Sequence, residues 1–393
     1  MKNSIINKKS GRIVNLLAYI FFFVCLLPAV IFVYRKPHHN WDMLAYMALA
    51  VKIDNPDINA IHTITYTAAK ENIPEYDYKL LTSPESKYRA RLAASATDFY
   101  SQLPFYVVKP LYIWLVYLGH RSGLSLPSAT IVPCMIAFLL SGMLLFHWLK
   151  KYMGLFACFI ASLLIMYSGY MISTARISSP DSLSAFFMFA AFYFIIERPP
   201  NTLFVFLLFL VSILIRVDNI IAATVITTFL CFSKRWSKRI TIPQYVLMIA
   251  CFTGLYFAIT NIATNYGWDK SYYSSFLHTA NGTFDFHDGF SIKRYAALMY
   301  SKAIGAVIFS HFSFFALMSL LMIAIPWPIR FRQLPFSKLF VLLLFCIMLI
   351  RFSLFPDLSD RFYTGFYLLI TVLFIRQFVE MVLSTGSNKP VSP

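Results

Sequence analysis

Long uninterrupted apolar stretches dominate this sequence. They are about 15 to 24 residues long and do not alternate with period two, which favours helices that cross lipid over strands. Inside a bilayer every backbone polar group must be paired within the chain, so only helices or closed barrels can span it. We therefore expect an all-α polytopic membrane protein of about ten transmembrane helices. Their approximate ranges are 13–34, 126–149, 152–173, 182–196, 201–216, 219–233, 242–263, 304–327, 336–355 and 362–380.

The composition supports lipid as the solvent for much of the chain. Of its 393 residues, 59% are hydrophobic and only 13% are charged, whereas a soluble domain is about half apolar and about a quarter charged. In a soluble protein the net charge of +17 would suggest nucleic acid, but here the basic clusters lie at the ends of apolar runs. We therefore expect the lipid bilayer as a partner and no nucleic acid.

The basic residues also predict the topology. Those ahead of the first apolar run place the N-terminus in the cytoplasm, and ten helices return the C-terminus to the same side. The two large exoplasmic loops are then 35–125, which contains interfacial helices, and 264–303. No repeat or flexible linker interrupts the chain, so we interpret residues 1–393 as a single membrane domain.

The acidic residues are distributed unevenly in this topology. Of the 17 Asp and Glu residues, only Glu197 and Glu380 fall on the cytoplasmic side. Acidic residues contribute little to orientation, so the bias needs a separate reason. Eight of them lie in the first loop, where simple solvation is an alternative. The others occupy short turns, and this favours a polar, functional exoplasmic face.

Two candidate residues lie in the first loop. Asp42 opens an apolar segment with helical spacing, which we expect to lie as an amphipathic helix in the membrane interface, with Tyr46 one turn further on. Lys109 sits in an aromatic stretch broken by Pro110, where it can meet a lipid phosphate. The alternatives are a helix cap for Asp42 and a lysine that snorkels to water for Lys109.

A second group of candidates lies in short turns between apolar runs. Arg176 and Asp181 flank a tight turn after the third expected helix, where a helix cap is the alternative role for Asp181. Arg216 and Asp218 lie so close to the hydrocarbon that they must be paired or functional. A mutual structural ion pair is the simplest interpretation of those two.

The last candidates come late in the chain. Arg361, which precedes the tenth expected helix together with Tyr363, is placed to hold a phosphate. The alternative for this arginine is an ion pair with Asp357 or Asp360. His287, in the second large loop, is a candidate for acceptor or metal binding.

Taken in order along the chain, these short motifs resemble those of the GT-C superfamily of integral membrane glycosyltransferases. The nearest likeness is to lipid A aminoarabinose transferases and protein O-mannosyltransferases, and it covers residues 13–200 well and the rest loosely. The residues that carry it are Asp42, Tyr46, Lys109, Pro110, Trp114, Asp181, Arg361 and Tyr363.

The resemblance implies a polyprenyl-phosphate sugar as donor and a lipopolysaccharide, glycan or protein acceptor, with transfer on the periplasmic side of a bacterial inner membrane. It implies that Asp42 is the catalytic base or orients the acceptor, and that Lys109 contacts the donor phosphate. We expect Arg361 as a second phosphate-binding cation, because negative charge develops on the departing phosphate. The expected substrate-binding residues are Tyr46, Asp181, Arg176, Tyr363 and His287.

No cofactor is assigned from the sequence, and a divalent metal stays an alternative. Several relatives carry an acidic residue directly after the first loop aspartate and another before the Lys-Pro pair. Here those positions are Met43 and Val108.

Two other functions remain as alternatives to a transferase. An O-antigen or polysaccharide polymerase commonly relies on arginines in large exoplasmic loops. A lipid-linked sugar flippase or transporter would place charged residues at mid-membrane depth among broken helices. The expected helix interiors are nearly free of charge, and this pattern favours the glycosyltransferase.

Overall fold

In the part of the chain that the structure describes, every regular element is a helix, apart from one isolated bridge between His38 and Ile177. The structure is a computed structural model. It describes residues 2–197, 202–233, 240–263, 265–276, 291–324 and 336–386.

The helices of the first half, in chain order, are α1 (Lys2–Arg35), α2 (Trp41–Lys52), α3 (Ile58–Asn72), α4 (Glu75–Thr82), α5 (Lys87–Ala94), α6 (Ala96–Gln102), η1 (Leu103–Phe105), α7 (Pro110–Arg121), α8 (Leu126–Leu149), α9 (Leu155–Met166), α10 (Gly169–Arg176) and α11 (Asp181–Glu197). Those of the second half are α12 (Thr202–Ile215), η2 (Val217–Asn219), α13 (Ile220–Phe232), α14 (Ile242–Ile262), α15 (Trp268–Phe276), α16 (Ile292–Phe309), α17 (His311–Ala324), α18 (Phe336–Leu354), η4 (Asp360–Phe362) and α19 (Thr364–Gly386).

Several helices have the length and composition of membrane spans. Among the described residues, five are long and apolar enough, and the bent pair α9 and α10 makes a sixth if it is one span. The five are Ile13–Arg35, Leu126–Leu149, Ile242–Ile262, Phe336–Leu354 and Thr364–Val382. The prediction of an all-helical chain with several apolar spans is therefore confirmed, whereas the count of ten stays a prediction.

Polar residues at the helix starts explain several boundaries. The Ser125 side chain accepts a hydrogen bond from the Ser128 amide and caps α8. Thr241 and Gln244 form a reciprocal capping box at the start of α14. Such residues accept hydrogen bonds from backbone amides that would otherwise lack partners. These helices therefore begin directly after their capping residues.

Two predicted runs are not straight single helices. The expected helix over 304–327 is wrong as one element, because α16 ends at Phe309 and α17 begins at His311. Between them, the Ser310 hydroxyl accepts a hydrogen bond from the Phe312 amide at 3.2 Å, which starts a new helix. The expected helix over 152–173 bends by 53° at the break between α9 and α10.

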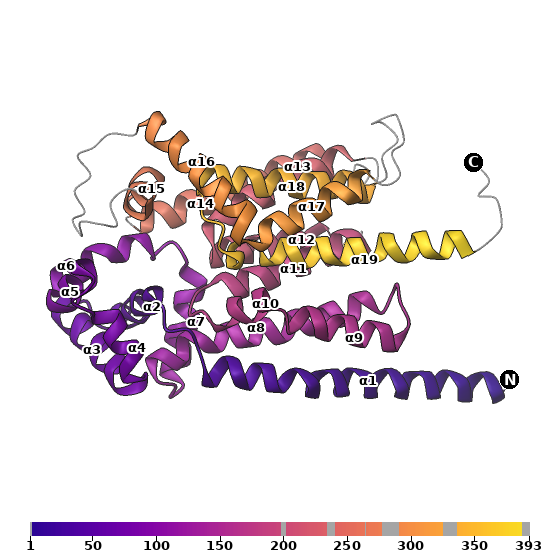
Figure 1. The fold of residues 1–393 in the computed structure, drawn as a ribbon, viewed down its shortest axis with the longest axis horizontal. Helices are drawn as coiled ribbons and strands as arrows, with labels where there is room; N and C mark the ends of the chain where they lie inside the picture. Colours follow the sequence, from indigo (N-terminus) through magenta and orange to yellow (C-terminus); the bar gives the residue numbers. More distant parts are fainter. Residues whose placement is uncertain are drawn as a thin grey trace.

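The helices are arranged with a distinct cap at one end. Figure 1 shows the long apolar helices running along the molecule, with α2 to α6 gathered at one end and the start of α1 and end of α19 at the other. In the centre, α11 packs against α8, α12 and α19. This helix is apolar on nearly every face, and most of its side chains are buried, as expected for such a pattern.

The structure corrects the expectation for α2. The predicted helix is present, but its side chains from Met43 to Val51 are all buried, so it does not lie as an amphipathic helix on a membrane surface. The reason is that α3, α7 and α8 pack around it. Residue Asp42, in its first turn, is therefore fixed by the protein core.

A close helix contact sets the position of the loop that precedes α19. A Cβ atom at Gly365 would lie 3.1 Å from the Ala185 carbonyl oxygen and 3.2 Å from the Ala185 Cα. A side chain at this position would make a tighter contact than most, so glycine favours this approach of α19 to α11, as small residues do in membrane helix pairs generally. The contact holds the segment that carries Arg361 against the start of α11.

The two acidic residues that were expected on the cytoplasmic side lie together. Glu197 pairs with Lys151 at 3.1 Å and with Arg376 at 4.0 Å, and Arg376 also pairs with Glu380 at 2.8 Å. This cluster is at the C-terminal end of α11, whereas Asp181 is at its N-terminal end. The structure thus separates these two glutamates from the candidate residues by the length of α11.

Candidate functional site

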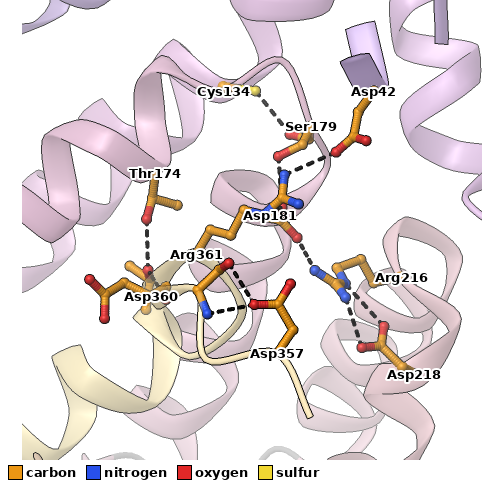
Figure 2. A network of polar contacts seen from close by, with 12 residues as sticks. Asp42, Cys134, Thr174, Ser179, Asp181, Arg216, Asp218, Asp357, Asp360 and Arg361 are labelled. Carbon is orange, nitrogen blue, oxygen red and sulfur yellow. Dashed lines mark hydrogen bonds and ion pairs between the residues drawn. The ribbon is translucent and has the colours of Figure 1, made fainter. Parts of the chain in front are cut away.

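Six charged side chains of alternating sign form a continuous chain at one end of the apolar helices. Figure 2 shows Asp42, Asp181, Arg216, Asp218 and Arg361 of this set. Each comes from the end of a helix or from a short turn. We call this set the ion-pair chain, and its members in order are Asp42, Arg361, Asp181, Arg216, Asp218 and Arg351.

The first half of the ion-pair chain joins residues that are distant in the sequence. Arg361 Nη1 lies 3.0 Å from Asp42 Oδ2, and Arg361 Nε lies 3.6 Å from Asp181 Oδ2. Asp181 also accepts a hydrogen bond from the Ser179 hydroxyl at 2.7 Å and pairs with Arg216. A single buried carboxylate is therefore shared by two guanidinium groups.

The second half centres on Asp218. Arg216 donates to it through Nε at 3.0 Å and through Nη2 at 2.9 Å, a bidentate geometry that fixes both groups. Arg351, near the end of α18, pairs with the same carboxylate. The predicted ion pair between Arg216 and Asp218 is confirmed, but it is one link of a longer network.

Much of this network is shielded from solvent. The exposed side-chain fraction is 2% for Asp181, 11% for Arg216 and 10% for Arg351. The Phe362 ring covers the guanidinium groups, with centroid distances of 4.6 Å to Arg216 and 4.8 Å to Arg361. Buried charges of this kind persist only when each is paired, because the cost of desolvation is large.

Lys109 differs from the three arginines of the ion-pair chain. It is partly buried directly before α7, and it makes no ion pair with any carboxylate in the described ranges. Its Nζ atom lies 5.1 Å from the Tyr106 ring centroid and 5.5 Å from that of Tyr46. Burial, together with the positive charge of Arg216, lowers the pKa of Lys109 to about 8. This ammonium group is thus available to an anion.

Tyrosines connect Lys109 with Asp42. The Tyr106 hydroxyl donates a hydrogen bond to Asp42 Oδ1 at 3.3 Å. Tyr46 is buried beneath them, with ring centroid distances of 5.6 Å to Tyr106 and 4.8 Å to Tyr112. Tyr46 was predicted to bind substrate, and the structure places it as a support behind Tyr106 and Lys109.

The other predicted substrate-binding residues lie in different places. Tyr363 is buried, and its hydroxyl donates to the Asp357 carbonyl at 3.4 Å. Arg176 lies outside the ion-pair chain and donates through Nε to the Lys36 carbonyl at 2.5 Å, which ties α10 to the end of α1. His287 falls outside the described residues.

Two of the simpler interpretations are wrong. The helix-cap position of α2 is held by Asn40, whose side chain makes no capping hydrogen bond, and Asp42 in the first turn pairs with Arg361 instead. The alternative to phosphate binding for Arg361 was an ion pair with Asp357 or Asp360, but its ion pairs are with Asp42 and Asp181.

Sequence reasoning missed Arg351, Tyr106 and Phe362. Arg351 carried a usable signal, because an arginine inside the apolar run 336–355 is costly unless it is paired or functional. Tyr106 and Phe362 carried none, since aromatic residues are abundant throughout this chain.

An open cleft adjoins the ion-pair chain on the side of Arg361. Its volume is about 330 Å³. Behind it, His311 Nδ1 donates a hydrogen bond to Asp360 Oδ2 at 2.6 Å. The residues that line the cleft are His38, Asn40, Ser173, Ile177, Ser359, Asp360 and Arg361.

The carboxylates of the ion-pair chain face guanidinium groups, so their arrangement suits charge stabilisation by arginine. Among the described residues, no group of three or more His, Cys, Asp or Glu side chains is arranged to hold a metal ion. Comparison of the chain with protein-family models, with curated proteins and with solved structures finds no match.

Proposed function

We propose that this protein is a membrane glycosyltransferase that moves a sugar from a polyprenyl-phosphate donor to a cell-envelope acceptor. One observation supports the proposal above all others. Asp42, Asp181 and Arg361, which the sequence motifs select from distant segments, form one ion-paired cluster with Lys109 beside it. A cluster that offers both a carboxylate and an unpaired ammonium group suits a reaction with an anionic leaving group.

The chemistry is a substitution at the anomeric carbon of the donor sugar. An acceptor hydroxyl oxygen forms the new bond to this carbon while the bond from the carbon to the phosphate oxygen breaks. The phosphate leaves with the bonding electrons, and the hydroxyl proton passes to the Asp42 carboxylate. A positioned base of this kind contributes roughly a hundred- to ten-thousand-fold to a rate.

The cations have separate roles in this scheme. Lys109 neutralises the departing phosphate, helped by its position at the N-terminus of α7, where the helix dipole favours an anion. Arg361 orients Asp42 through the 3.0 Å ion pair and adds positive charge next to the reaction. Asp181 and Arg216 hold Arg361 in place.

The proposal includes the membrane setting. The ten-span GT-C-like fold, cytoplasmic termini and a periplasmic site in a bacterial inner membrane are its further elements. They are supported by the gathering of the ion-pair chain at helix ends, where the cap of α2 to α6 also lies. A polar site at one rim of the apolar helices suits an enzyme that meets both a lipid donor and a water-soluble head group.

A transfer assay with matched variants tests the proposal. Purified protein receives radiolabelled polyprenyl-phosphate sugars and bacterial envelope acceptors, and we expect Asp42→Asn and Lys109→Ala to abolish transfer. The matched controls lie in the same loop. Asp98→Asn removes a carboxylate that pairs with Arg91 at 2.6 Å, and Lys52→Ala removes an ammonium group 4.8 Å from the Tyr100 ring. Both controls should keep wild-type transfer.

The same preparation separates the alternative functions. A flippase would move the labelled lipid across liposomes without forming a product, and a polymerase would extend a lipid-linked oligosaccharide. Wild-type transfer in both Asp42→Asn and Lys109→Ala, at normal expression, would show that the site is wrongly assigned.

A further inference from the structure

The open cleft beside Arg361 has the size and walls of a binding site. It is separate from the ion pairs themselves. Its volume of about 330 Å³ lies at the lower end of ligand pockets and leaves room for one sugar ring. One wall is rigid, because the His38 amide donates to the Arg176 carbonyl at 2.7 Å and bridges to Ile177. The opposite wall is the turn before α19, which carries Ser359 and Asp360.

The charged side chains of this cleft have polar partners behind its walls. Arg361 is paired with Asp42 and Asp181, and Asp360 is paired with His311 at 2.6 Å. Of the other polar residues in the lining, Asn40, Ser173 and Ser359 carry no charge at any pH, and His38 is titratable. The cleft therefore differs from the surroundings of Lys109, where the ammonium group makes no ion pair with a carboxylate of the described residues.

Asn40 provides an unused hydrogen-bonding group in the wall. It occupies the cap position of α2, where asparagine usually bonds to a backbone amide, but here it makes no such bond. Its Oδ1 atom is buried and has no hydrogen-bond partner among the residues that the structure describes. A buried acceptor without a donor is unfavourable. Once the Asn40 side chain turns toward the cleft, a hydroxyl group can supply that donor, whereas an ionised phosphate diester has no proton to offer.

We propose that this cleft binds an uncharged, hydroxyl-bearing sugar ring and is the acceptor subsite of the enzyme. The inference rests on the proposed function and assigns the donor and the acceptor to separate subsites. The donor phosphate lies on the side of Lys109, and the acceptor lies on the side of Asn40 and Ser359. Arg361 stands between them, since it lines the cleft and also holds Asp42 at 3.0 Å.

Protection of an introduced cysteine tests the occupant without any need for transfer. Ser359→Cys is labelled with a charged maleimide in the purified full-length protein, in the presence of glucose, galactose, mannose or N-acetylglucosamine. Dimethyl phosphate, an ionised diester with no proton to donate, is the competing probe. Ser122→Cys, at the exposed end of α7, is the matched control, and the wild-type protein gives the background from the native cysteines.

We expect at least one monosaccharide to slow labelling at Ser359→Cys and not at Ser122→Cys, while dimethyl phosphate slows neither. When Asn40→Ala is combined with Ser359→Cys, the sugar concentration that gives half-protection should rise about tenfold. This is the effect expected from the loss of one hydrogen bond. Protection by dimethyl phosphate alone, or equal protection at both cysteines, would overturn the assignment.

The outcome is independent of the transfer assay. Protection by a sugar in a protein that transfers nothing would refute the proposed function and leave a sugar-binding cleft. Transfer without any protection would refute the acceptor subsite and leave the proposed function intact.

Discussion

Asp42 and Arg361 are 319 residues apart in the sequence, yet their side chains form an ion pair with an Nη1 to Oδ2 distance of 3.0 Å. One residue belongs to a helix buried in the first loop, and the other to the turn before the last helix. The pair joins the group of helices α2 to α6 to the C-terminal part of the molecule. Arg361, whose guanidinium group holds Asp42, also lines the open cleft.

The buried carboxylate of Asp181 should be essential for stability. Asp181→Asn leaves Arg361 and Arg216 without their shared counter-charge, and loss of one partner in a buried pair costs about 3–5 kcal/mol. Thermal unfolding of the purified protein measures the loss. Asp98→Asn, which breaks a more exposed pair with Arg91, is the control and should cost about 1 kcal/mol or less. Equal shifts in the two variants would contradict the role of Asp181.

Lys109 should make donor binding depend on pH. Burial and Arg216 lower its pKa to about 8, so the ammonium charge is lost as pH rises through that value. Transfer at low donor concentration should therefore fall above about pH 8. The Lys109→Arg variant keeps its charge in this range and should lose the dependence, even if its transfer rate is lower.

The stability effect of the same group has the opposite sign. Between about pH 8 and the ordinary lysine value of 10.5, the unfolded chain binds more protons at Lys109 than the folded one. The contribution of Lys109 to stability therefore rises with pH, so titration of this group does not itself cause unfolding. An identical fall in wild type and Lys109→Arg would rule out this lysine as the titrating group.

Gly365 should be intolerant of any side chain. In Gly365→Ala the new Cβ would lie 3.1 Å from the Ala185 carbonyl oxygen, and a backbone atom cannot move aside as a flexible side chain can. We expect a lower unfolding temperature and reduced transfer, because the turn that holds Arg361 shifts. Gly254→Ala, in α14, is the control, since a Cβ there meets nothing within 4 Å. A wild-type unfolding temperature for Gly365→Ala would show that the helix contact does not position the site.

The helices could be predicted from the sequence because their apolar length and polar caps are local properties. The run 126–149 matches α8 at both ends, since Ser125 caps its start and Lys150 follows its end. The prediction of one helix over 304–327 was wrong. A single serine, Ser310, inside a continuous apolar run does not stand out in the sequence as a helix boundary. The location of α2 in the protein core was also not predictable, since it depends on neighbours far along the chain.

The site was predictable as a set of residues but not as a network. Aspartates and arginines at the ends of apolar runs are unusual, so Asp42, Asp181 and Arg361 could be selected individually. Their partners could not, because the local choice for Arg361 was Asp357 or Asp360 and the actual partners come from α2 and α11. Ion pairing across such distances is decided by helix packing.

The most direct measurement is the transfer of radiolabel from a polyprenyl-phosphate sugar to an envelope acceptor, compared between Asp42→Asn and its control Asp98→Asn. Asp42→Asn keeps the size of the side chain. It removes the carboxylate that is proposed to take the proton from the hydroxyl group of the acceptor. Our account predicts a loss of roughly a hundredfold or more for Asp42→Asn and wild-type transfer for Asp98→Asn. Equal transfer by both variants, at equal amounts of folded protein, would contradict it.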